Sequence, residues 1–178
     1  MFIQEMTEAE CLKTLTRTRF GRLACAHENQ PYVVPIHFVY ENSYLYGFTT
    51  PGQKVEWMRS NPLVCVELDE NVDEIQWMSI VIFGSFEELP ETQQDKERWN
   101  QYRSLPHHDR LQESGGELRH AYELLQQNAE WWEPGCASST HRNPVLPLLP
   151  VFYRIRIDRI GGRRFTPRPS SQAVPYTD

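Results

Sequence analysis

The sequence is poor in lysine and lacks any apolar run long enough to cross a bilayer. Lysine occurs three times among its 18 basic residues, and no apolar stretch approaches the roughly 18 residues that a transmembrane helix needs. The formal net charge is −6, whereas domains that bind nucleic acid are usually basic. The first residues, MFIQEMTEAEC, carry acids where a signal peptide would carry bases. We therefore expect a cytoplasmic protein that binds neither membranes nor nucleic acid.

The sequence also lacks the spacings typical of metal sites and catalytic triads. Its cysteines are scattered, with no C-x-x-C pair: Cys11, Cys25, Cys65 and Cys136. Buried free thiols pack as small apolar groups, and that is the role expected here. His107 and His108 are adjacent, so their side chains point in different directions, and no H-x-x-x-H or H-E-x-x-H pattern occurs. We predict no metal site, and spacing specifies no nucleophilic triad.

Short apolar segments predict a mainly antiparallel β protein. Six segments are predicted to be strands: 20–26, 32–40, 44–50, 63–69, 77–89 and 151–160. Pro35 removes a hydrogen-bond donor from its strand and predicts an edge or a bulge, and Gly84 predicts a bend or bulge in the fifth segment. Strands this short and closely spaced favour a small barrel with flanking helices over a doubly wound parallel sheet.

Helical patterns occur near the N-terminus, in the middle and late in the chain. Thr7 and Glu10 have capping-box spacing before a short apolar face. A second helix is predicted within 51–62, and further helical patterns occupy 91–105 and 115–128. We predict one domain over residues 1–165, with a helical or irregular insertion at about 90–150 and a tail at 166–178. Whether the insertion, with Trp131 and Trp132, covers a pocket or extends a dimer contact stays open.

The stretch LYGFTTPGQKV, residues 45–55, is close to a phosphate-binding P-loop but departs from it. Gly47 and Gly52 stand five apart, as the motif G-x-x-x-x-G-K-[ST] requires. However, Gln53 occupies the lysine position, Lys54 comes one place late, and Val55 cannot bind magnesium. Triphosphate chemistry is therefore excluded, and both glycines are interpreted as turn formers only.

What remains in this stretch suits a phosphate monoester held without metal. Thr49 and Thr50 end a strand, and Lys54 follows a Pro-Gly turn into a helix, where unpaired amides favour an anion. Such a group terminates flavin mononucleotide, pyridoxal phosphate and small phosphorylated metabolites. The alternative is that Thr49 caps the turn and Lys54 is a solvated helix residue.

Three further positions have candidate roles. His37 lies in a strand, where it is either structural or a weak candidate proton donor. Asp158 is expected to pair with an arginine rather than act as a base. Arg163 and Arg164 follow two glycines, so they reach a ligand at a strand end or simply meet the acidic segments.

Several segments, in order, resemble the pyridoxamine 5′-phosphate oxidase-like flavoproteins, and most nearly the branch of nitroimidazole-resistance-type proteins. They are FGRLACA, PYVVPIHFVYENSYLYGFTTPGQKVEWMRSNPLVCVELDE, WMSIVIFGSFEEL and YRIRIDRIGGRR. The similarity covers residues 1 to about 90 and 150–165. It implies a six-stranded split β-barrel that forms a homodimer and binds FMN between two subunits.

The resemblance also implies which residues contact FMN. The strand-to-helix turn would bind the phosphate, the VPIHF backbone would run beside the isoalloxazine ring, and a later strand would approach from the opposite subunit, with one arginine closing the site. In that order they are Thr49, Thr50, Gln53 and Lys54; Val34, Pro35, Ile36, His37 and Phe38; Trp77, Met78 and Ser79; and Arg163 or Arg164.

The implied function is an FMN-dependent oxidoreductase acting on a small planar substrate, with NADH or NADPH as a possible reductant. Relatives in the nitroimidazole branch often carry histidine where this chain has Phe48, and the arginine–histidine set of true pyridoxamine phosphate oxidases is missing, so no substrate is named. The alternative is a non-catalytic flavin- or haem-binding protein, or a sensor, on the same fold.

Overall fold

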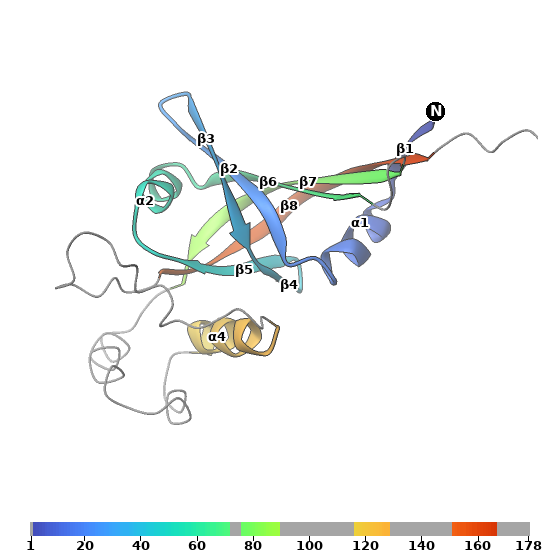
Figure 1. The fold of residues 1–178 in the computed structure, drawn as a ribbon. Coiled ribbons are helices and arrows are strands. Elements are labelled where there is room, and N and C mark those ends of the chain that lie inside the picture. The colour runs from blue at the N-terminus through green and yellow to red at the C-terminus, as the bar shows by residue number, and fades with distance from the viewer. Residues whose placement is uncertain (1, 72–75, 90–115, 129–150, 167–178) are drawn as a thin grey trace, which may run out of the picture.

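A computed structural model describes residues 2–71, 76–89, 116–128 and 151–166. In chain order the elements are β1 (Phe2–Met6), α1 (Glu8–Leu15), β2 (Phe20–His27), β3 (Gln30–His37), β4 (Val39–Glu41), β5 (Tyr44–Thr49), α2 (Gln53–Ser60), β6 (Leu63–Asn71), β7 (Trp77–Glu88), α4 (Gly116–Asn128) and β8 (Val151–Thr166). Figure 1 shows the strands as one curved sheet. The predictions on the segment 91–105, on Trp131 and Trp132 and on the tail beyond Thr166 lie outside the described residues.

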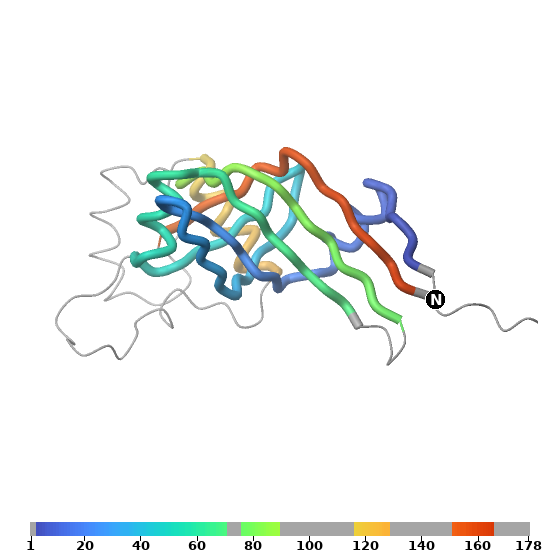
Figure 2. Tube along the Cα trace, turned by 90° about the horizontal axis from the view of Figure 1, so that it is seen from above, coloured from blue at the N-terminus to red at the C-terminus, as the bar shows by residue number. Residues whose placement is uncertain are grey.

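The sheet is antiparallel throughout and strongly curled. Seven strands follow one another in the order β3-β2-β6-β7-β8-β5-β4, and β1 pairs with the end of β8. β3 and β4 are the two edges, although only Phe38 separates them in the chain. The sheet must curl until these edges approach each other, and Figures 1 and 2 show that curvature. Because β3 and β4 are not paired with each other, the fold is a split barrel, as predicted.

The described residues form eight strands where the sequence predicts six. The sequence does not predict β1, which pairs only with residues 162–166 and has no local partner. The predicted strand 32–40 is divided at Phe38, whose amide donates to the Arg19 carbonyl at 3.0 Å instead of continuing the ladder. β8 runs past Ile160 through Gly161 and Gly162, so Arg163 and Arg164 lie inside a strand rather than after a turn.

Three local predictions are confirmed. Thr7 and Glu10 form a capping box: the Thr7 amide donates to the Glu10 carboxylate at 2.8 Å, and the Glu10 amide donates to the Thr7 hydroxyl at 3.3 Å. Pro35 lies in the edge strand β3. The β7–β8 register shifts at Gly84, where a Cβ would overlap the Arg156 carbonyl.

The main core lies on the concave inner face of the sheet. Alternate residues of β2, β6 and β7, including Leu23, Val66 and Ile82, are fully buried there. α1 and α2, at opposite ends of the sheet in both views (Figures 1 and 2), add apolar side chains to this core. We call the opposite, convex side the outer face.

α4 covers the outer face of β4, β5 and the start of β8. Its buried residues Leu118, Ala121 and Leu125 pack with Tyr46 and Phe152 in a second apolar cluster. α4 corresponds to the predicted helical pattern 115–128, so that prediction is confirmed. Neither α4 nor any other described helix is long and apolar enough to cross a membrane.

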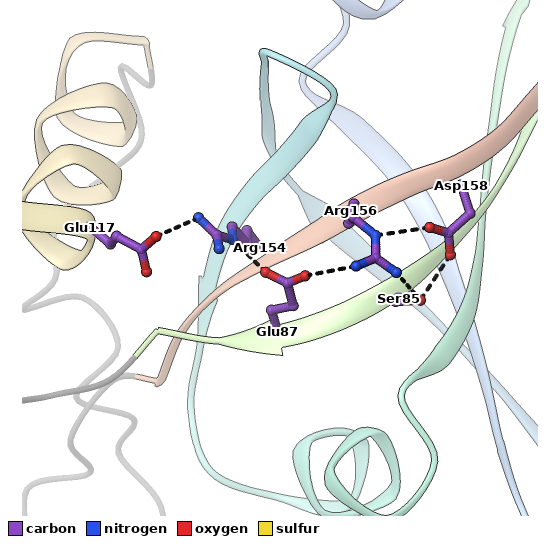
Figure 3. Close-up of polar contacts among 6 residues, drawn as sticks. All are labelled: Ser85, Glu87, Glu117, Arg154, Arg156 and Asp158. Atoms are coloured by element: carbon purple, nitrogen blue, oxygen red, sulfur yellow. Dashed lines mark hydrogen bonds and ion pairs between the residues drawn. The ribbon is translucent and has the colours of Figure 1, made fainter.

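Arg154 fastens α4 to the sheet, and Arg156 extends the same network along the strands, as Figure 3 shows. Arg154 donates to Glu87 in β7 at 2.6 Å and to Glu117 in α4 at 3.1 Å. Arg156 pairs with Asp158 at 3.0 Å, which confirms the predicted role of that aspartate. These strand arginines thus meet acidic residues and serve the fold.

Candidate functional site

The predicted phosphate turn joins β5 to α2. β5 ends at Thr49, Gly52 is the N-cap, and α2 begins at Gln53. The first hydrogen bonds of the helix are donated by the amides of Val55 and Glu56 to the Gly52 carbonyl. Among the described residues, nothing accepts the preceding amides of Gln53 and Lys54. Such amides at a helix start are donors for an anion.

Lys54 is a half-buried cation beside these amides. It makes no hydrogen bond or ion pair with any residue that the structure describes. Burial lowers the pKa of its ammonium, and the charge of the neighbouring Cys25 thiolate would act in the opposite direction. An ammonium removed from water without a partner is costly. Lys54 therefore lies in a position that an anionic ligand would stabilise, and it is not the fully solvated residue of the alternative interpretation.

The segment Val34–Phe38 lies next to the same turn. Its side chains alternate, with Ile36 and Phe38 buried in the core and Pro35 and His37 exposed on the outer face. The His37 carbonyl lies 3.3 Å from the point where a Cβ on Gly47 would stand, two residues before Thr49. One chain therefore brings together the two segments predicted to contact the phosphate and the ring.

Gly47 is not a turn former, so the sequence interpretation of that glycine is wrong. It lies inside β5, where a Cβ would stand 2.8 Å from the hydroxyl of Tyr153. Tyr153 is buried in the core, and burial raises the pKa of its hydroxyl well above the ordinary value. Gly47 is needed because the strand passes directly against this ring.

The remaining predicted site residues lie at the other end of the sheet. Met78 pairs with Arg164 and Ser79 with Arg163 across β7 and β8, whereas Thr49 pairs with Val151 at the start of β8. The twelve residue steps from Val151 to Arg163 correspond to about 40 Å of strand. A single chain therefore does not bring these residues to the phosphate turn.

The two arginines at this far end differ. Arg164 donates to Glu10 in α1 at 2.9 Å, so its charge serves the fold. Arg163 is exposed on the outer face and makes no ion pair with a described residue. Of the pair, Arg163 is the one that remains available to a ligand or a second chain. Trp77 stacks on Phe165 beside it, with ring centroids 6.0 Å apart.

Sequence reasoning missed three aromatic residues beside Lys54. Trp57 follows Lys54 by three positions in α2, so both lie on one flank of the helix. Its ring centroid lies 5.5 Å from that of Tyr32 and 5.7 Å from that of His27. The i, i+3 spacing of the lysine and the tryptophan was the available signal. In the described part of the chain, no three metal-binding side chains cluster.

Comparison with known proteins agrees with this architecture. Residues 7–128 match the family described as pyridoxamine 5′-phosphate oxidase. The chain belongs to the pyridoxamine 5′-phosphate oxidase family. An uncharacterized family relative from Rhizobium meliloti is 34% identical over 163 residues, or 92% of this chain and 95% of that protein. The resemblance stated from the sequence is thus confirmed.

Solved structures show the same family fold. The crystal structure of an FAD-binding protein from Mesorhizobium loti is 37% identical, covers 93% of this chain and all of that one, and superposes with a TM-score of 0.65. A protein from Bacteroides thetaiotaomicron named for 5-nitroimidazole antibiotic resistance is 17% identical, covers 93% and 90% of the two chains, and has a TM-score of 0.57. At that identity the second likeness shows the fold alone.

Proposed function

We propose that this chain is a flavoprotein that binds the FMN moiety of a flavin at the start of α2. The observation that carries the proposal is Lys54, a half-buried cation that has no described partner and lies beside two unpaired amides. The Mesorhizobium loti relative named as FAD-binding supports a flavin as the ligand. FMN and FAD share the isoalloxazine ring, the ribityl chain and its phosphate, so this site fits either one.

The flavin lies between two copies of the chain in this proposal. All six exposed large hydrophobic side chains of the described residues lie on the outer face: Ile3, Phe20, Val33, Leu63, Trp77 and Phe83. Patches of this kind commonly mark protein interfaces. A second copy on this face would also supply the Trp77–Arg163 end of the sheet, which one chain keeps far from its own phosphate turn.

The protein's role is to bind and orient, and the flavin when bound supplies hydride or electron transfer. Lys54 and the α2 amides hold the phosphate, and the Val34–Phe38 backbone lies along the ring. The His37 side chain points to the outer face, 5.2 Å from Phe20 between ring centroids, and is our candidate proton donor. We propose an oxidoreductase acting on a small planar substrate, reduced by NADH or NADPH.

The Phe48 side chain belongs to the second apolar cluster. It contacts Phe152 and packs against the cluster beneath α4. The resemblance to the nitroimidazole branch leads us to expect a histidine here, so this position offers no support for nitroimidazole as the substrate.

The absorption spectrum and the mass of the purified protein test the proposal. We expect flavin absorption bands, bleaching under anaerobic NADH or NADPH, and a mass by light scattering of twice the 21.0 kDa chain. A colourless protein that takes up no added flavin contradicts the proposal, and a haem spectrum favours the haem-binding alternative. A 21.0 kDa monomer that binds flavin contradicts only the shared site.

A further inference from the structure

Three aromatic rings cluster beside α2, and the tryptophan among them is on the helix flank that also carries Lys54. Trp57, Tyr32 and His27 are each only partly buried, and their rings contact one another through Trp57. The His27 ring is held by Ser60, with 3.0 Å between Nδ1 and Oγ. Ser60 itself donates to the Trp57 carbonyl at 2.9 Å, so His27 donates to Ser60 and its ring orientation is fixed.

The cluster continues the line of the proposed flavin site. The segment Val34–Phe38, which is proposed to lie along the isoalloxazine ring, comes at one end of β3. Tyr32 lies nearer the other end. Tyr32 pairs with Cys25, whose thiol lies close enough to Lys54 to influence the pKa of the ammonium. His27 pairs with Gln30 at the far end of the β2–β3 hairpin. Along the hairpin, the segment Val34–Phe38 is therefore followed by Tyr32, level with Cys25 and Lys54, and then by His27.

We infer that the aromatic cluster binds the adenosine half of FAD, which makes FAD rather than FMN the preferred flavin. This inference rests on the proposed function, because it assumes that Lys54 binds the flavin phosphate. Adenine is a flat base that stacks on aromatic side chains. In FAD it is joined through a pyrophosphate to the same ribityl chain, so the order of groups matches the order of residues along the hairpin.

The alternative use of these rings is core packing alone. Trp57 and Tyr32 do pack against the main core on one side. His27, however, is not part of that core, and its side chain is 42% exposed. A purely structural cluster would affect both flavins equally when it is altered, whereas an adenosine site affects only FAD.

Titration of the flavin-free full-length protein with FMN and with FAD tests the inference. Stacking of one base on an aromatic side chain corresponds to about 5- to 150-fold in affinity. We expect the wild type to bind FAD more tightly than FMN by a factor in this range. Trp57→Leu should remove that preference while its FMN affinity stays unchanged.

A second variant, at a half-exposed position, keeps the test valid if Trp57→Leu fails to fold. His27→Ala alters a half-exposed ring and should weaken FAD binding alone, and His120→Ala, on α4, is its matched control with no expected effect. Equal wild-type affinity for FMN and FAD overturns the inference, as does an equal loss for both flavins in Trp57→Leu. If neither flavin binds the wild type, the proposed function itself fails.

Discussion

Two partly buried basic side chains have opposite surroundings. Arg154, with 19% of its side chain exposed, lies between the carboxylates of Glu87 and Glu117 and over the ring of Tyr44, 4.5 Å from its centroid. Burial alone would lower its pKa, but these carboxylates raise it well above the ordinary value. Lys54 is half-buried with no described partner, and its pKa is lowered.

The contrast separates a charge used for folding from one kept for a ligand. A buried ion is tolerated when it is paired and hydrogen-bonded, and Arg154 meets that condition by joining β7, β8 and α4 (Figure 3). Lys54 does not meet it within the described chain. Because the lysine lies at a helix start beside amides that have no acceptor among the described residues, we attribute its position to the flavin phosphate.

The largest expected effect is on flavin binding when Lys54 is replaced by methionine. Removing one charge-assisted hydrogen bond corresponds to about 1.5–3 kcal/mol, so FMN affinity should fall about 10- to 150-fold. Fluorescence titration of the flavin-free protein measures this. Lys13→Met, on the exposed side of α1, is the matched control and should bind FMN like the wild type. Unchanged affinity in Lys54→Met would place the phosphate elsewhere.

The second effect concerns stability at the other cation. Arg154→Met leaves Glu87 and Glu117 without their shared donor, so the free energy of unfolding should fall by about 1–3 kcal/mol. Arg156→Met removes a half-exposed partner from the same network, and because solvent screens that pair its effect should be smaller than that of Arg154→Met. Urea unfolding measures both. A loss of FMN affinity in Arg154→Met would contradict the separation of roles.

The smallest effect is a pH dependence of the flavin-free protein. Burial places the folded-state pKa of Lys54 below its ordinary value of 10.5, so between these two pKa values the unfolded chain binds more protons and stability rises with pH. Lys54→Met should therefore be more stable than the wild type at neutral pH, and this advantage should shrink as pH approaches 10.5. Thermal midpoints of both proteins, compared at each pH, test this. A constant difference would show that Lys54 is not desolvated.

Much of the fold could be predicted because its signals are local. The Thr7–Glu10 pair marks the start of α1, Pro35 marks an edge strand, and Gly84 marks a register shift. β1 could not be predicted, because it exists only by pairing with residues 162–166. The extension of β8 through Gly161 and Gly162 was missed for a similar reason, because the need for a glycine there comes from a distant part of the chain. Gly162 is required by α1, since a Cβ there would stand 2.9 Å from the sulfur of Cys11.

The candidate site was predictable in part. The order of threonines, turn and lysine in one segment pointed to a phosphate, and that segment does lie beside Val34–Phe38. The burial of Lys54 and its separation from Arg163 depend on how distant strands pack, which no local pattern records. The role of Gly47 was missed for the same reason, because it is set by Tyr153 more than a hundred residues later in the chain.

The most direct test compares FMN with riboflavin, which lacks only the phosphate. Affinities of both for the wild type and for Lys54→Met give the free energy that couples this side chain to that phosphate. We predict that the wild type prefers FMN and that this preference falls by about 10- to 150-fold in Lys54→Met, with the α2 amides keeping the remainder. A variant that keeps the full preference for FMN would contradict the account.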